Sequence, residues 1–254
     1  MDDATLIALW KREEQQPFEG WNFSYLKDRY SEEQPPWSYE QMVRDLLRGA
    51  DSVLDMGTGG GEKLLEFKNV LPANTVATEG YTPNVPVARA NLEPHGIRVI
   101  DYNLEVAPRM PFDDNTFGLI IDRHEAFDAK EVARILRPGG VFLTQQVDGR
   151  ELGDFRTHFG YESAFLHVNV ENCSQGLADA GLEIVRAEEW AGKSTFQDVG
   201  ALVYFLHAAP WSAPEDFSVE RYTPQLLALY WKGEPLQFTI RRFYIQARKP
   251  LHAS

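Results

Sequence analysis

Four glycines and two acids stand within ten residues of this chain, in the stretch VLDMGTGGGE from Val53 to Glu62. An apolar, strand-like run ends at Asp55, and the glycines follow directly. Glycine-rich turns after strands let the backbone bend sharply and approach a bound nucleotide. The stretch therefore predicts a site for a nucleotide-type ligand, and the residues around the glycines decide which ligand it is.

Two common nucleotide-binding patterns do not fit this turn. A phosphate loop needs a lysine followed by serine or threonine at the end of its glycines, whereas Lys63 is followed by Leu64. A dinucleotide fingerprint needs a third small residue three positions after the second glycine, and that position holds Glu62. The remaining pattern is Asp-x-Gly-x-Gly-x-Gly, over residues 55–61. Because an aspartate repels a pyrophosphate, the pattern favours a ligand that carries positive charge. S-adenosylmethionine (SAM), with a sulfonium and an ammonium group, is such a ligand.

Strand-like and helix-like segments alternate around this turn. Ser38 and Gln41 form a capping-box pattern before a helix whose apolar face carries Tyr39, Val43 and Leu47. Helices are also expected after the glycine turn, after the second strand and before the fifth. The expected strands are SVLDM, TVATE, IRVID, FGLIID and VFLTQQV. This alternation predicts an α/β fold with a parallel sheet covered on both faces.

The chain from about Ser38 to Val147 resembles the class I SAM-dependent methyltransferases. The resemblance lies in four segments taken together, VLDMGTGGG, ATEGY, MPFDDNTFGLII and RILRPGGVFL. Within that class the chain is most similar to the small-molecule branch that includes the ubiquinone/menaquinone C-methyltransferases. The resemblance implies a doubly wound, mostly parallel, seven-stranded Rossmann-like sheet whose last strand is antiparallel, a strand that FTIRRFYIQARK can supply. It also implies methyl transfer from SAM to a small-molecule acceptor, with release of S-adenosylhomocysteine.

We expect one methyltransferase domain over residues 1–254, because no segment resembles a linker. Residues 1–37 would form an N-terminal helical and aromatic cap. Residues 38–150 would form the SAM-binding half, and residues 151–254 the substrate-side half.

The resemblance implies which residues hold the cofactor. The glycine turn would line the methionine part of SAM, with Asp55 near its amino group, and Glu79 would hold the ribose hydroxyls. The two residues after Glu79 would lie beside the adenine. The family usually places an aspartate after the third strand, but this chain departs from that pattern, and alternation along the strand favours Asn103 over Asp101 as the adenine contact. The full cofactor-binding set is Asp55, Gly57, Thr58, Gly59, Gly61, Glu79, Gly80, Tyr81, Asn103 and Asp101.

The segment RHEAF follows the fourth strand, at the carboxyl edge where open α/β sheets bind ligands. His124 is a candidate general base, because an unperturbed histidine has a pKa near 6.5. Glu125 could do the same work if burial raised its pKa. Both residues could instead cap or open the next helix.

Aromatic rings could cover the methyl donor by cation–π attraction, or could serve packing alone. The substrate-side and lid candidates are Trp37, Tyr39, Arg123 and Trp211.

Composition limits the partners. The net charge is −13 and the basic residues are dispersed, which disfavours nucleic acid as the substrate. Cys173 is the only cysteine, so neither an intrachain disulfide nor a multi-cysteine zinc site can form, and no metal is expected. No apolar run approaches the roughly 20 residues that cross a bilayer. We therefore expect a cytoplasmic protein with no membrane partner.

Two alternative functions stay open. An RNA base methyltransferase is opposed by the charge of −13, and a steep salt dependence of RNA binding would support it. A non-catalytic SAM-binding or partner-binding module would keep the glycine turn but lack space for an acceptor beyond the methyl group. The sequence names neither the acceptor, nor the methylated atom, nor the oligomeric state.

Overall fold

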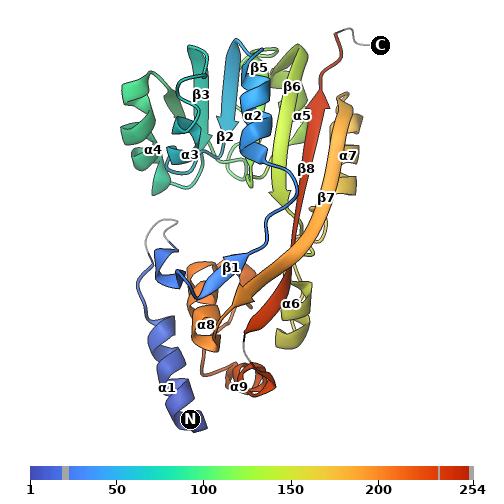
Figure 1. The fold of residues 1–254 in the computed structure, drawn as a ribbon. Coiled ribbons are helices and arrows are strands. Elements are labelled where there is room, and N and C mark those ends of the chain that lie inside the picture. The colour runs from blue at the N-terminus through green and yellow to red at the C-terminus, as the bar shows by residue number, and fades with distance from the viewer. Residues whose placement is uncertain (19–22, 234, 252–254) are drawn as a thin grey trace. The chain divides into compact units, whose positions relative to one another are not determined.

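The computed structural model describes residues 1–18, 23–233 and 235–251 (Figure 1). The chain forms two compact units. The first unit comprises residues 1–35, 149–166 and 191–241, and the second comprises residues 36–148, 167–190 and 242–254. Strands β7 and β8 each contribute residues to both units. The single methyltransferase domain expected over residues 1–254 stays a prediction.

The second unit is built on parallel strands joined by helices (Figure 1). Its parallel strands are β2 (Ser52–Met56), β3 (Asn74–Glu79), β4 (Arg98–Asp101), β5 (Phe117–Arg123) and β6 (Leu136–Val147). Its helices are α2 (Tyr39–Leu47), α3 (Glu62–Leu65), α4 (Asn84–Leu92), η2 (Glu93–His95), α5 (Ala129–Ile135) and α7 (Val170–Asp179). Strand β8 (Leu236–Arg248) runs antiparallel to β6, with Val147 opposite Arg242. The mostly parallel α/β sheet with an antiparallel last strand is confirmed.

The sheet has eight strands among the described residues, one more than the seven expected. Their hydrogen-bonded order is β1-β7-β8-β6-β5-β2-β3-β4. The additional strand, β1 (Tyr30–Glu32), pairs antiparallel with the end of β7 (Glu183–Phe196), where Tyr30 lies opposite Phe196. It falls in the segment expected to form only the N-terminal cap. A three-residue strand is too short to show the alternation by which strands are recognised in a sequence.

The first unit contains helices, strand β1 and the adjoining parts of β7 and β8. Its helices are α1 (Asp3–Glu14), η1 (Ser24–Leu26), α6 (Gly153–Phe159), α8 (Val199–Ala208), η3 (Pro210–Ser212) and α9 (Thr223–Lys232). Helix α8 is almost wholly buried, and α1 packs against it. The guanidinium of Arg29 joins these parts, because it donates to Asp198 at 2.9 and 2.6 Å and to Glu13 at 2.9 Å. Within the described residues, no helix is both long and apolar enough to cross a bilayer.

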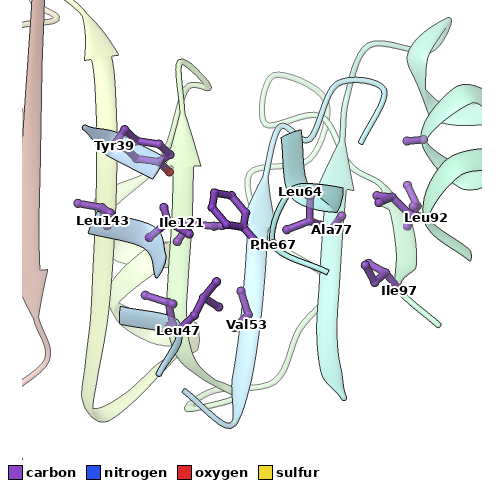
Figure 2. Close-up of a cluster of buried hydrophobic side chains, with 14 of the residues drawn as sticks. Tyr39, Leu47, Val53, Leu64, Phe67, Ala77, Leu92, Ile97, Ile121 and Leu143 are labelled. Carbon is purple, nitrogen blue, oxygen red and sulfur yellow. The ribbon is translucent and has the colours of Figure 1, made fainter. Parts of the chain in front are cut away.

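Neighbouring residues of the central strands of the second unit face opposite sides of the sheet. Val53 and Ile121 pack with Tyr39 of α2 in one buried cluster (Figure 2). Leu54 and Ile120 belong to a second cluster, which includes residues of α5 and α7. Because both faces are covered, the strands are continuous apolar runs rather than alternating ones. Packing on both faces therefore holds the strands in place up to their carboxyl ends, where the glycine turn begins.

Ile120→Val tests the second cluster. Ile120 has 0% of its surface exposed. Loss of one buried methylene should lower the free energy of unfolding by about 1 kcal/mol, measured by urea denaturation. Val106 is 82% exposed, and Val106→Ala should leave the stability unchanged. Equal midpoints for the wild type and Ile120→Val would contradict this packing.

Candidate functional site

The glycine turn lies at the end of β2, where the strand order reverses between β2 and β5. Open α/β sheets bind ligands outside the carboxyl ends of strands at such a point. The backbone φ angle is +64° at Gly57, +62° at Gly59 and +86° at Gly61, a conformation that glycine adopts readily. A Cβ added at Gly59 would meet no atom within 4 Å. The turn therefore has open space beside Gly59.

Glu79 ties the glycine turn to the end of β3. One carboxylate oxygen accepts from the N–H of Gly59 at 2.6 Å, and the other accepts from the N–H of Tyr81 at 2.7 Å. The side chain of Glu79 is 4% exposed. A carboxylate has about four lone-pair positions, so these two bonds leave it able to accept from ligand hydroxyls. Glu79 therefore stabilises the turn without any ligand, and its contact with ribose stays a prediction.

Asp55 is a partly buried acid next to the turn. Burial raises the pKa of Asp55 to about 7, the hydroxyl of Thr58 opposes the shift, and the charge of Glu79 adds to it. Burial is the largest of these causes. A cation placed beside such a carboxyl favours its ionised form. The site therefore suits a positively charged ligand.

The residues expected beside the adenine lie where β3 and β4 end. A Cβ at Gly80 would be 2.6 Å from the carbonyl oxygen of Tyr102 and 3.2 Å from Cα of Asn103, so only glycine allows this approach. The side chain of Asn103 accepts from a backbone N–H two residues further on. Tyr81 is 63% exposed, and Asp101 is exposed at the end of β4. The structure brings Gly80 and Asn103 together, while the choice between Asn103 and Asp101 stays a prediction.

Asp122, at the carboxyl end of β5, is a buried acid that the sequence analysis missed. It is 0% exposed. Its carboxyl accepts from the Thr144 hydroxyl at 2.9 Å, from the Gln146 side chain at 2.9 Å and from the N–H of Glu125 at 3.1 Å. Burial raises the pKa of Asp122 well above its usual value. Its position at the end of the apolar run FGLIID was the signal in the sequence that could have identified it.

Glu125 lies against the glycine turn. A Cβ added at Gly57 would be 2.5 Å from the carboxylate Oε2 of Glu125. The carbonyl of Glu125 accepts from the side-chain amide of Gln146 at 2.8 Å, which fixes the backbone of the loop. Burial, followed by the charge of Glu79, raises the pKa of Glu125. The predicted catalytic residue is thus adjacent to the predicted cofactor turn, and its role stays a prediction.

His124 has a backbone φ of +67°, which is uncommon for a residue other than glycine. Its N–H donates to the carbonyl of Gln145 at 2.8 Å. Burial lowers the pKa of the His124 imidazole to about 3, and the positive charges of Arg242 and Arg123 add to the shift. His124 is exposed to solvent, which limits the effect of burial. Because its pKa is shifted downward, the imidazole is uncharged at neutral pH.

Two aromatic candidates contact the strand ends. The indole N–H of Trp37 donates to the side-chain oxygen of Gln145 at 2.8 Å. The hydroxyl of Tyr39 donates to the carbonyl of Asp122 at 3.0 Å. Tyr39 is 6% exposed, so it belongs to the core as well as to the border of the site. Both rings are therefore held by polar contacts with β5 and β6.

The other two substrate-side candidates, Arg123 and Trp211, belong to different units of the chain. The guanidinium of Arg123 lies 3.3 Å from a carboxylate oxygen of Glu40 and 5.9 Å from the ring centre of Tyr39. Trp211 lies in η3 of the first unit, and its side chain is outside what the structure describes. Arg123 is therefore grouped with the glycine turn in the second unit, while the substrate-side role of Trp211 stays a prediction.

Comparison with known proteins identifies a methyltransferase domain over residues 54–144. The uncharacterized methyltransferase YcgJ of Bacillus subtilis is 23% identical over 229 residues, which cover 80% of this chain and 86% of YcgJ. The ubiquinone/menaquinone biosynthesis C-methyltransferase UbiE of Geobacter sp. is 28% identical over 177 residues, covering 60% of this chain and 73% of UbiE. Sterol 24-C-methyltransferase erg6 of Aspergillus fumigatus is 25% identical over 199 residues, covering 68% of this chain and 52% of erg6.

The crystal structure of YcgJ has the same fold. It superposes with a TM-score of 0.57 at 19% identity, over 83% of this chain and 97% of YcgJ. The matched domain contains the glycine turn, Glu79 and the end of β5, the three places where the site residues gather. SAM is the cofactor of this enzyme. Residues 54–144 thus match the methyltransferase domain family, and the chain resembles the class I SAM-dependent methyltransferases, including their ubiquinone/menaquinone C-methyltransferase branch.

Proposed function

We propose that this enzyme transfers the methyl group of SAM to a small-molecule acceptor. The observation that carries the proposal is the glycine turn with its partly buried acid, Asp55, beside the open space at Gly59. Two relatives, UbiE and erg6, are named for C-methylation in ubiquinone/menaquinone biosynthesis and of sterols. The net charge of −13 supports a small molecule over RNA.

The residues of the turn suit the parts of SAM. The open space at Gly59 would admit the methionine part, and Asp55 would lie near its amino group. Glu79 would use its remaining lone pairs for the ribose hydroxyls. SAM supplies a methyl group on a positively charged sulfur. The protein's own work is therefore to position two reactants and to exclude water.

The acceptor side is proposed around the loop after β5. Where the acceptor atom carries a proton, Glu125 and His124 are the two candidates to receive it. Trp37 and Tyr39 contact β6 and β5 next to the same loop, and Arg123 is the last residue of β5. The cytoplasmic location is likewise proposed, on the ground that the chain has a single cysteine.

Transfer of an isotope-labelled methyl group from SAM tests the function. The wild type is incubated with labelled SAM and, separately, with quinone precursors, sterols, phenols, carboxylic acids and total RNA, and the products are analysed by mass spectrometry. We expect label in a small-molecule class, and none with Gly59→Arg. Label in RNA alone would replace the small-molecule assignment. Tight SAM binding without transfer to any acceptor would favour the non-catalytic module.

A further inference from the structure

Polar contacts run from Trp37 through Gln145 to His124. The indole nitrogen of Trp37 lies 2.8 Å from the side-chain oxygen of Gln145. The side-chain nitrogen of Gln145 lies 3.4 Å from Nε2 of His124. Gln145 is 5% exposed, so water offers its amide few other partners. The side-chain amide of Gln145 therefore depends on Trp37 and His124 for its hydrogen bonds.

The direction of these hydrogen bonds follows from Trp37. An indole N–H can only donate, so the oxygen of the Gln145 amide must face it. The amide NH2 then faces Nε2 of His124. If Nε2 also carried a proton, two donors would face each other. The buried NH2 of Gln145 would then lack an acceptor, at a cost of about 1–3 kcal/mol. Nε2 must therefore be the acceptor, and the single proton of the neutral ring sits on Nδ1.

The strands fix the positions of all three residues. The ring of Trp37 packs edge-on against Tyr244, with centroids 4.9 Å apart and planes at 63°. Gln145 lies directly opposite Tyr244 in the β6–β8 pairing. Arg123 and Arg242 are the charged groups that act on His124, and both oppose a positive imidazole. Packing and pairing thus hold Trp37 and Gln145 in place, and the two positive charges favour the neutral form of His124.

We propose that Trp37 and Gln145 are positioning residues that hold His124 as the neutral tautomer protonated on Nδ1. His124 then offers a hydrogen-bond donor to the acceptor molecule, because its Nε2 lone pair is engaged by Gln145. In the described part of the chain, no protein group bonds to Nδ1. The acceptor would present a carbonyl or another oxygen acceptor to His124, and Glu125 would be the group that receives a proton. This last consequence rests on the proposed function, whereas the tautomer does not.

Nitrogen-15 NMR of the full-length protein with labelled histidine reads the tautomer directly. The wild type should show His124 with a protonated Nδ1 and an unprotonated Nε2 at neutral pH. His158 serves as an internal reference of the opposite kind, because its Nε2 lies 2.9 Å from the carbonyl of Gln225 and must donate. A His124 signal with a protonated Nε2 would overturn the assignment without any variant.

Two variants test the roles of Gln145 and Trp37. In Gln145→Glu, a carboxylate can accept from both Trp37 and a protonated His124, so the pKa of His124 should rise by at least about two units. In Trp37→Phe the amide is free to turn over, and His124 should become a mixture of tautomers. An unchanged pKa in Gln145→Glu, or an unchanged tautomer in Trp37→Phe, would contradict the positioning roles. SAM affinity measured on the same samples separates these results from a failure of the methyltransferase function.

Discussion

Gly59→Arg is expected to abolish binding of SAM and S-adenosylhomocysteine while the chain stays folded. A Cβ at this position would meet no protein atom within 4 Å, so we expect arginine to extend into the space proposed for the cofactor. Its charge would also repel the cationic ligand, by about 1–4 kcal/mol at 4 Å. We expect the dissociation constant for SAM to rise at least about 100-fold, measured by calorimetric titration.

Gly181→Arg is the matched control for that experiment. Gly181 also has a positive φ, of +88°, and also has no atom within 4 Å of an added Cβ. It follows α7, so it is away from the glycine turn. Both variants therefore carry the same backbone strain, of about 1–2 kcal/mol, and the same added charge. Equal loss of binding in the two variants would mean that strain, rather than occupation of the site, causes the effect.

The central strands could be predicted from the sequence because both of their faces are buried. Neighbours such as Val53 and Leu54 belong to different clusters, and an apolar run is the pattern that such burial produces. The start of α2 was also predictable, since the Ser38 side chain accepts from the N–H of Gln41 at 3.1 Å. This N-cap hydrogen bond is local in sequence, and local patterns are the ones that a sequence shows most clearly.

Much of the candidate site was not predictable, because its contacts depend on strand register. Asp122 lies opposite Thr144 and Arg123 lies opposite Gln145 in the β5–β6 pairing. The residues of each pair are 22 positions apart in the chain, and nothing in their spacing indicates that they are neighbours. The rule that ligands bind at the ends of strands identified the loop after β5, but not the polar residues of β6 beneath it. Register is set by the packing of whole strands.

Asp55→Asn is expected to stabilise the unliganded protein at pH 8. The pKa of Asp55 is about 7 in the folded chain, above the ordinary value of 3.8. Below pH 4 the carboxyl is protonated in both states and the variant gains nothing. Between pH 4 and 7 the unfolded chain ionises first, so the wild type loses stability relative to the variant, and above pH 7 the difference is constant. Because Asp55 is partly exposed, we expect the free energy of unfolding of Asp55→Asn to exceed that of the wild type by on the order of 1–2 kcal/mol at pH 8, measured by urea denaturation.

Asp179→Asn is the control for this comparison, because Asp179 is exposed at the end of α7. It removes the same charge, and its stability should stay within about 0.5 kcal/mol of the wild type at every pH. Equal stability of Asp55→Asn and the wild type at pH 8 would show that the Asp55 carboxyl has no unfavourable desolvation. The pH at which the difference appears identifies the titrating group as Asp55.

The Asp55→Asn variant should also bind SAM at least about tenfold more weakly than the wild type, a loss of roughly 1.4 kcal/mol of binding free energy. A cation bound beside Asp55 stabilises the ionised carboxylate, so SAM affinity of the wild type should fall by up to about tenfold for each pH unit below 7. Asp55→Asn should lack this dependence. If S-adenosylhomocysteine shows the same pH dependence, Asp55 faces the amino group, which both ligands carry. If SAM alone shows it, Asp55 faces the sulfonium. A carboxylate that destabilises the unliganded chain and attracts its cationic ligand is the trade-off expected where stability yields to function.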